Sequence, residues 1–361
     1  MKRMKRRMIK SLIALTAAVT LSSAYAQQTD GFEVIPVQGN IYMLAGAGAN
    51  ISVSLGRDGV LLVDSGAPQM GDKVLAKVRE LATAVIAYPA PFQPCVGLRC
   101  ESRYSYGWSS PSFNAVTQSP TPAKPIRYII NTSIHPDHIG GNVPLAESGV
   151  TYIGGNVTGT IADAGQGAAV MAHENVLTRM SVPEAGQQAA PERAWPTETY
   201  FTPFYKLSHF FNGEGVQLYY APAAHSDGDT FVYFRYSDVI SAGELFNNET
   251  YPIIDVAKGG TVQGIIDGLN QILDVGYAEF RSQGGTIVIP ARGRLGDIAD
   301  VAVYRNMVSI IRDRIRDLKQ KGMTPAQVKA ARPTRDFDGR WGTTSGAWTT
   351  DKFIDAVYQT L

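Results

Sequence analysis

The sequence is poor in cysteine, histidine and net charge. Of its 361 residues, two are cysteine and five are histidine, and 33 Lys+Arg nearly balance 32 Asp+Glu. An apolar content of 44% excludes a disordered chain, and the near-zero charge excludes an obvious nucleic-acid binder. The sequence also lacks a dinucleotide-binding glycine pattern after a strand-like run, so a redox protein would need a separate flavin or iron partner.

Long apolar runs are missing as well. The stretch from Leu12 to Leu21 is shorter than the roughly 20 residues of a membrane-spanning helix. Six Lys and Arg precede it and Ala24-Tyr25-Ala26 follow it, so we expect residues 1–26 to be a signal peptide cleaved after Ala26. The pair Arg6-Arg7 leaves the twin-arginine and the general export routes both open. Without the six cations the net charge of +1 becomes −5. We expect a soluble periplasmic or secreted protein.

The two cysteines, Cys95 and Cys100, lie close together in the sequence. In an oxidising compartment we expect them to form a disulfide, because metal binding by two thiolates normally needs further Cys or His nearby. They lie in a segment rich in Pro and aromatic residues, 88–125, which we interpret as an insertion with little regular structure.

The rest of the chain alternates strand-like and helix-like patterns, which favours one α/β (α+β) layered domain over 27–361 rather than an all-β sandwich. A Pro- and Ala-rich loop at 181–200 joins its two halves. The expected strands are 34–37, 40–44, 50–55, 60–64, 126–131, 150–153, 216–221, 230–236, 239–241 and 286–290, of which the first four form an antiparallel meander. The expected helices are 68–83, 170–180, 262–275, 299–320 and 351–360.

Three metal-ligand types occur within four residues directly after the expected strand at 126–131. They are His135, Asp137 and His138, in the segment Asn-Thr-Ser-Ile-His-Pro-Asp-His-Ile-Gly-Gly-Asn of residues 131–142. Imidazoles with a carboxylate suit a borderline divalent cation such as zinc. Because the whole chain has only five histidines, two of them in this turn favour a metal site over ordinary polar turn residues.

This segment resembles the metal-binding signature of the metallo-β-lactamase superfamily, His-x-His-x-Asp-His followed by Gly-Gly. Further similar segments occur in the same order at residues 39–42, 58–66, 224–229, 243–246 and 289–293. The resemblance implies a four-layer αβ/βα sandwich with metal held at one edge by loops that leave the strands. The superfamily hydrolyses β-lactams, thioesters, lactones and phosphoesters, so fold alone does not choose the substrate.

Carried over by position, the resemblance assigns His135 and His225 to a first zinc, and Asp137 and His138 to a second. Two usual histidines are replaced in this chain, by Ser133 at the start of the signature and by Arg292 near the end. Glu244 stands where many members have a metal-bridging Asp, and we count it as a ligand.

The resemblance also implies supporting roles around the ligands. Asp64 and Asp229 would orient ligands from the second shell. The hydroxyl of Ser133 would hold a metal-bound water. Arg292 would repel a second ion and weaken that site, because it is a permanent cation. Paired with Asp137, Arg292 would stand in for the charge of that ion, or its guanidinium would clamp a substrate anion.

The sequence therefore predicts an exported zinc-dependent hydrolase with one or two ions, the second site being the weaker. Its substrate would be a small amide, ester or lactone, with a β-lactam as the specific guess, and it would bind neither nucleic acid nor, after signal cleavage, a membrane. Asp137 would accept the proton of a metal-activated water, and Arg292 would act beside it. The alternative is a metal-poor, catalytically silent binding protein of the same fold.

Overall fold

The computed structural model describes residues 31–56, 58–87, 125–150, 167–182, 188–279 and 284–361. The chain separates into a unit of residues 1–33, of which 31–33 are described, and a compact unit from Val34 to Leu361. The expected signal peptide, the insertion up to residue 124, and Cys95 and Cys100 lie outside the described residues.

The first sheet has seven strands that lie in chain order. It begins with an antiparallel meander, as expected from the short glycine-punctuated runs, and its last four strands are parallel. The strands are β1 (Glu33–Gln38), β2 (Ile41–Ala45), β3 (Ile51–Gly56), β4 (Gly59–Val63), β5 (Ile126–Ile130), β6 (Ala169–His173) and β7 (Glu198–Tyr200).

The second sheet has six strands in the order β13-β12-β11-β10-β9-β8. Only the β11–β12 pair is parallel. The strands are β8 (Phe204–Lys206), β9 (Val216–Ala221), β10 (Asp229–Phe234), β11 (Val239–Ser241), β12 (Ile287–Ile289) and β13 (Gly296–Asp297). Strands β9, β11 and β12 run the same way, so the loops that follow them leave from one edge.

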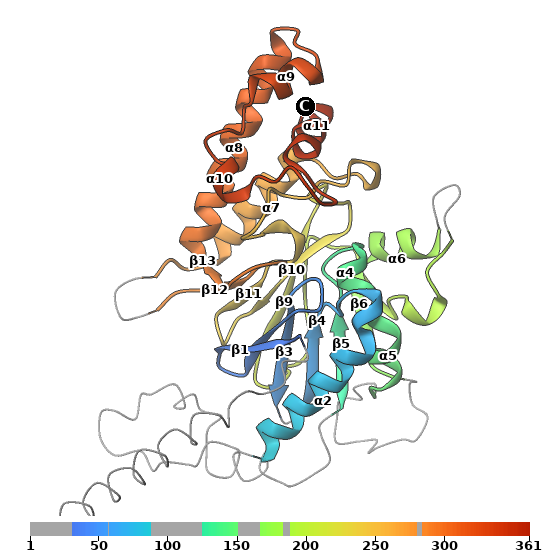
Figure 1. Cartoon of the computed structure of the whole chain (residues 1–361). Coiled ribbons are helices and arrows are strands. Elements are labelled where there is room, and N and C mark those ends of the chain that lie inside the picture. The colour runs from blue at the N-terminus through green and yellow to red at the C-terminus, as the bar shows by residue number, and fades with distance from the viewer. Residues whose placement is uncertain (1–30, 57, 88–124, 151–166, 183–187, 280–283) are drawn as a thin grey trace, which may run out of the picture. The chain divides into compact units, whose positions relative to one another are not determined.

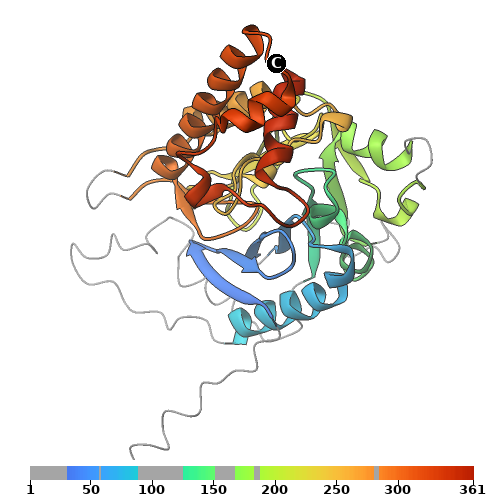
Figure 2. The ribbon, with the colours of Figure 1, turned by 45° about the horizontal axis from the view of Figure 1, so that its top comes forward.

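Helices cover the outer face of each sheet and complete a four-layer α/β sandwich (Figures 1 and 2). The first sheet carries η1 (Pro68–Met70), α2 (Gly71–Ala87), α4 (Pro136–Ile139), α5 (Asn142–Glu147), α6 (Glu174–Ser181) and η3 (Glu192–Ala194). The second carries η4 (Gly243–Leu245), η5 (Val256–Lys258), α7 (Val262–Val275), α8 (Ile298–Gln320), α9 (Pro325–Ala331), α10 (Asp338–Trp341) and α11 (Thr350–Thr360). No described helix has the length and apolar character that crossing a bilayer requires.

Two large apolar clusters hold the layers together. One lies between the sheets and includes Val63, Ile130, Met171, Leu218 and Phe234. The other packs α7, α8 and α11 on the outer face of the second sheet. Because both faces of the central strands are buried, β4 and β6 are apolar at nearly every position instead of alternating.

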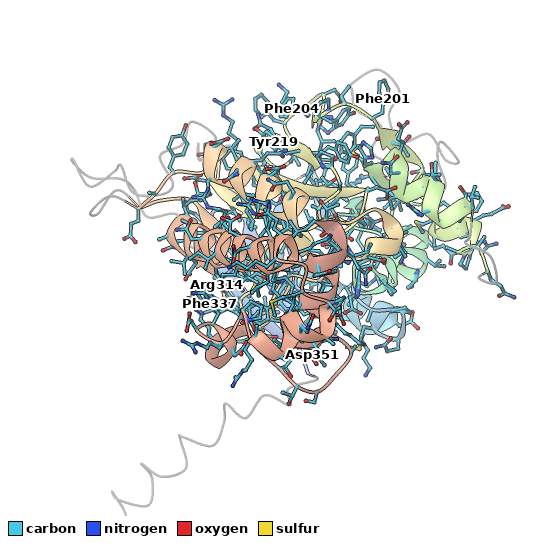
Figure 3. The ribbon with its side chains drawn as sticks, turned by 90° about the horizontal axis from the view of Figure 1, so that it is seen from above. Phe201, Phe204, Tyr219, Arg314, Phe337 and Asp351 are labelled. Atoms are coloured by element: carbon cyan, nitrogen blue, oxygen red, sulfur yellow. The ribbon has the colours of Figure 1, made fainter. Side chains whose placement is uncertain are left out.

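Polar and aromatic contacts hold the C-terminal segment against the rest of the domain. Arg314 of α8 donates to the carbonyl of Pro333 and to Asp336, and its guanidinium lies 5.8 Å from the ring centre of Phe337 (Figure 3). Tyr251 stacks on Phe353 of α11 with ring centres 4.7 Å apart. These contacts place α11 on the same side of the molecule as the loop before α7.

Most expected elements are present, and helix 262–275 has the predicted bounds. The helix expected at 170–180 is instead the buried strand β6 followed by α6, and the loop expected at 181–200 contains η3 and β7. A short buried strand is apolar throughout, so its pattern fits a helix as well as a strand. The strand expected at 150–153 lies, except for Val150, outside the described residues.

The start of α7 is pressed against the loop that leads to His225. A Cβ added to Gly264 would lie 1.9 Å from the carbonyl oxygen of Ala223, whereas a Cβ on Gly339 of α10 would meet nothing within 4 Å. We predict that Gly264→Ala lowers the free energy of unfolding by about 2 kcal/mol or more, because the backbone must move. Gly339→Ala should change it by less than about 1 kcal/mol. Equal effects in a chemical denaturation series would contradict this packing.

Candidate active site

The site lies where loops from both sheets leave the ends of their strands. Asp64 follows β4, residues 131–135 follow β5, His225 follows β9, Glu244 follows β11 and Arg292 follows β12. The two sheets are joined beside it by the backbone hydrogen bond from Thr230 N to the Thr132 carbonyl. Residues more than 200 positions apart in sequence therefore meet at one rim.

The turn that carries the motif is shaped by Pro136 and two glycines. His135 caps α4 by accepting a hydrogen bond from the Asp137 amide at its Nδ1, and Pro136 occupies the first helical position, where no amide donor is needed. A Cβ on Gly140 would lie 2.2 Å from Pro68 N, and one on Gly141 2.1 Å from the Ser65 carbonyl oxygen. The Gly-Gly pair thus lets this turn approach the loop after β4.

Asp64 is the buried anchor of the site. It has φ +70°, a left-handed conformation that is uncommon for a residue other than glycine and is stabilised by its contacts. Its carboxylate accepts hydrogen bonds from Thr132 N at 2.8 Å and the Thr132 hydroxyl at 2.8–2.9 Å, and faces His138 Nδ1 at 2.7 Å. Asp64 therefore fixes the orientation of the His138 ring through Nδ1. Sequence reasoning missed Thr132, which has no distinctive motif.

His138 is fully buried between two carboxylates. Its Nδ1 faces Asp64, and its Nε2 lies 2.9 Å from Glu244 Oε1. Burial alone would lower the pKa of His138, but the charge of Asp64 and the hydrogen bonds to both carboxylates outweigh it and raise this pKa to about 10. Burial opposes ionisation of Glu244, but its contacts with His138 and Arg292 hold its pKa well below the usual range. The two buried carboxylates therefore favour a cation between them, and in this structure protonated His138 is that cation.

Arg292 bridges Glu244 and Asp137. Its Nη1 donates to Glu244 Oε1 at 2.8 Å, and its Nη2 donates to Asp137 Oδ2 at 2.7 Å. The predicted pairing of Arg292 with Asp137 is thus present, and the same guanidinium also holds Glu244. Burial works against its charge, but the two carboxylates outweigh this and raise the pKa of Arg292. The guanidinium therefore binds the same two carboxylates that a second ion would need as ligands.

His225 sits beside Ser133 and Asp229. Its Nδ1 lies 3.3 Å from Ser133 Oγ and 3.7 Å from Asp229 Oδ1. Burial, partly offset by His225 and the amide of Ser226, raises the pKa of Asp229. These oxygens favour the proton on Nδ1, which leaves the lone pair on Nε2. That Nε2 is buried and has no hydrogen-bond partner in the described part of the chain.

Three potential donor atoms lie close together. His135, His138 and Glu244 each place one ligand atom within 4.8 Å of the others. The ring centre of His135 is 5.7 Å from that of His225 and 6.0 Å from that of His138. Burial, with smaller effects from neighbouring charges, lowers the pKa of His135 to about 4, so it is a neutral base at pH 7. These nitrogen and carboxylate donors fit one zinc-like ion.

The grouping differs from the assignment by resemblance. That assignment put His135 with His225 and Asp137 with His138. In the structure His135 converges with His138 and Glu244, while Asp137 is held by Arg292. Ser133 does contact His225, and Asp229 supports the same histidine, so all the predicted site residues within the described ranges lie in one cluster. Spacing along the chain does not specify which atoms converge.

In the metal-free protein, we predict that His138 keeps both ring protons through pH 8, whereas His135 stays neutral down to about pH 5. The pKa of His138 is raised from 6.5 in the unfolded chain to about 10. Its contribution to stability is therefore fully present below pH 6.5 and is lost as the pH rises through 10. Titration of the imidazole nuclear magnetic resonance signals checks both histidines. A His138 signal that titrates near pH 6.5 would contradict the paired-carboxylate geometry.

Comparison with known families and folds agrees with this architecture. A family model described as the metallo-beta-lactamase superfamily matches residues 34–284. A search of curated proteins finds no match.

Among solved structures, a double mutant of the sec-alkyl sulfatase PisA1 aligns with TM-score 0.56 and 14% identity over 91% of this chain and 50% of the sulfatase. The stereoselective inverting sec-alkylsulfatase Pisa1 from Pseudomonas sp. aligns with TM-score 0.54 at the same identity and coverage. A metallo-beta-lactamase from Pontibacter korlensis aligns with TM-score 0.48 and 13% identity over 77% of this chain and 99% of that one. The chain spans about half the length of the sulfatases. Because the family match covers well over half of the sequence, the chain belongs to the metallo-beta-lactamase superfamily.

Proposed function

We propose that this protein is an exported, zinc-dependent hydrolase that uses one divalent ion and acts on a small amide, ester or lactone. The observation that carries the proposal is the convergence of His135, His138 and Glu244 within 4.8 Å beside the unpartnered Nε2 of His225. A buried imidazole nitrogen without a partner is costly unless something binds it. Export rests on the expected signal peptide at residues 1–26.

The same residues define what each group would do. His135, His138 and Glu244 would hold the ion, and His225 would complete the set through Nε2. A bound zinc supplies a Lewis acid that lowers the pKa of water and polarises a carbonyl oxygen. Asp64 contacts His138 Nδ1 and so keeps the ring oriented, which would leave Nε2 directed at the ion.

Asp137 is the proton acceptor in this proposal. Arg292 holds its Oδ2, and in the described residues no hydrogen bond reaches its Oδ1. The Asp137 side chain is 28% exposed, so it is accessible from solvent. Arg292 fixes the carboxylate in place and neutralises part of the negative charge.

A second candidate is a metal-poor binding protein, and one observation favours it. Protonated His138 and Arg292 already give each of Asp64, Glu244 and Asp137 a cationic partner without any ion, which leaves one net negative charge among the five groups. Zinc and the proton on His138 Nε2 therefore compete for one nitrogen, and binding should release a proton. Whether zinc or the proton occupies His138 Nε2 near neutral pH decides between the hydrolase and the binding protein.

Metal content and turnover separate these candidates. We expect the purified mature protein to carry about one zinc per chain, and His135→Ala or His225→Ala to weaken zinc binding at least about tenfold. Both variants should lose turnover of a panel containing a β-lactam, a lactone, an ester and an alkyl sulfate. His209→Gln is the matched control, because His209 packs near Tyr128 and Phe211, away from this cluster. Zinc in fewer than about one chain in ten would support the binding protein instead.

The identity of residue 292 sets the number of ions. Arg292→His removes a fixed cation, frees Asp137 and Glu244, and restores the ligand type that the superfamily usually has there. We predict that zinc content rises from about one toward two ions per chain. Arg294→His is the control, because Arg294 is exposed and pairs with Asp300. An unchanged ratio by elemental analysis would show that Arg292 does not limit the second site.

A further inference from the structure

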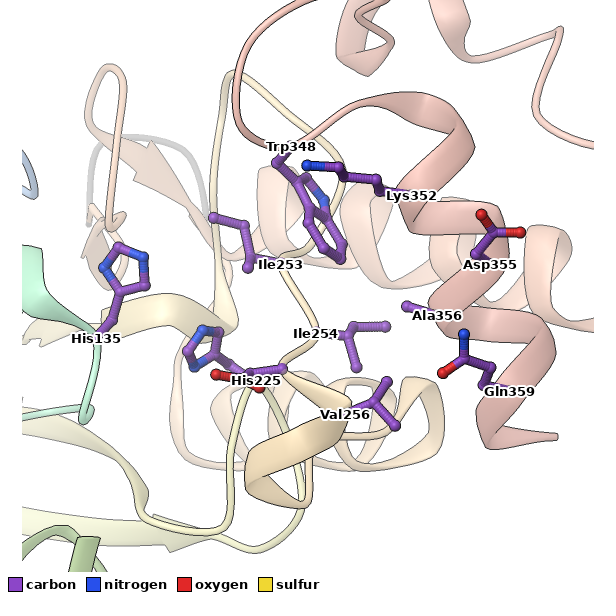
Figure 4. Close-up of a pocket in the computed structure, with 11 residues that line it drawn as sticks. His135, His225, Ile253, Ile254, Val256, Trp348, Lys352, Asp355, Ala356 and Gln359 are labelled. Carbon is purple, nitrogen blue, oxygen red and sulfur yellow. The ribbon is translucent and has the colours of Figure 1, made fainter. Parts of the chain in front are cut away.

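A cavity of about 420 Å³ opens from the candidate site toward the C-terminal helix. His135 and His225 line one end, and residues of α11 and the loop before it line the other (Figure 4). A volume of this size accommodates a small organic molecule. Any substrate whose reacting group contacts His135 and His225 would extend its remaining part into this space.

The middle of the cavity is apolar. Ile253, Ile254 and Val256 come from the segment between η4 and α7, and they face Trp348 and Ala356 across the space (Figure 4). Burying hydrocarbon or an aromatic ring against these side chains is favourable by about 25 cal/mol per Å². This wall favours a substrate with an apolar body.

The far end carries one uncompensated positive charge. Two acids line the cavity, but Asp255 is paired with Lys258, and Asp355 lies 2.9 Å from Lys329. Lys352 is the one Lys or Arg among the lining residues, and no carboxylate pairs with it in the described part of the chain. Its Nζ donates to the carbonyl of Ala347 at 2.6 Å, which leaves further N–H donors free.

Trp348 adds a second donor beside Lys352. Its Nε1 is buried and has no hydrogen-bond partner within the described ranges. Figure 4 shows the side chain of Lys352 lying next to the Trp348 indole. One ammonium and one indole N–H match the single charge and two oxygens of a carboxylate, whereas a phosphate dianion would keep an uncompensated charge.

We propose that the cavity selects substrates with an apolar body and a terminal carboxylate, and that Lys352 and Trp348 are the residues that determine this specificity. The inference rests on the proposed hydrolase function, because it names the substrate class of that site. Both residues lie beyond the family match at 34–284: Lys352 is on α11, which the Tyr251–Phe353 stack holds in place, and Trp348 is in the loop before it. Specificity is thus provided by a part of the chain separate from the metal donors.

Binding measured without turnover tests the inference directly. Calorimetric titration of the full mature chain compares phenylhexanoate with phenylhexanol, which share the apolar body and differ in charge. We expect the acid to bind about tenfold more tightly, equivalent to about 1.4 kcal/mol. Lys352→Gln should abolish this preference and Lys352→Arg should keep it. Trp348→Phe should weaken binding of the acid several-fold by removing the N–H donor.

Lys321→Gln is the matched control, because Lys321 is exposed and pairs with Asp317 on α8. Equal affinity for acid and alcohol in the unaltered protein, or a preference that survives Lys352→Gln, would overturn the inference. Should Trp348→Phe fail to fold, the Lys352 pair still decides the result.

Turnover of the nitrophenyl monoester of adipic acid against nitrophenyl hexanoate distinguishes the two proposals. Carboxylate binding without turnover of either ester would leave the inference standing and remove the hydrolase function. Turnover of both esters at equal kcat/KM would retain the hydrolase function and overturn the inference.

Discussion

The burial of negative charge at the rim between the two sheets is the constraint on which the site depends. Asp64 and Glu244 are almost fully enclosed, and Asp137 lies beside them. Buried carboxylates are stable only when a cation or several donors compensate them. Here a cation is required on each side of Glu244, supplied by His138 on one side and Arg292 on the other. Under the proposed function, a divalent ion would meet the same requirement by replacing the His138 proton, so metal occupancy and protonation would be alternatives.

The directions of the strands bring these acidic side chains together. In each sheet the loops that carry site residues follow strands that run the same way, so their ends gather at one edge. The packing there is tight enough to require a left-handed Asp64 and glycines at 140 and 141. These backbone contacts hold the donors of the rim close together.

The sequence was sufficient to predict the layered class, the bounds of α7, and the proximity of His135, Asp137, His138, His225 and Glu244, because these depend on local patterns in a known order. It was not sufficient for features that depend on three-dimensional contacts. The buried strand β6 satisfies a helical period, so its sequence alone did not separate the two. Which donor atoms converge depends on side-chain directions at the ends of different strands. Trp348 and Lys352 have no motif, and they are connected to the site only through the packing of α11 on the second sheet.

The charges of Arg292 and Lys352 are related. Both residues lie after residue 284, beyond the part that matches the superfamily. With one divalent ion and a neutral His138, the charges of Asp64, Asp137, Glu244 and Arg292 are balanced, so the rim has little net attraction for an anionic substrate. If Arg292 takes the place of a second ion, as we propose, a charged part of the substrate would be recognised elsewhere. Lys352 lies on a separate helix and lines the same cavity, where under our proposal its charge would act on the substrate without disturbing the balance around His138.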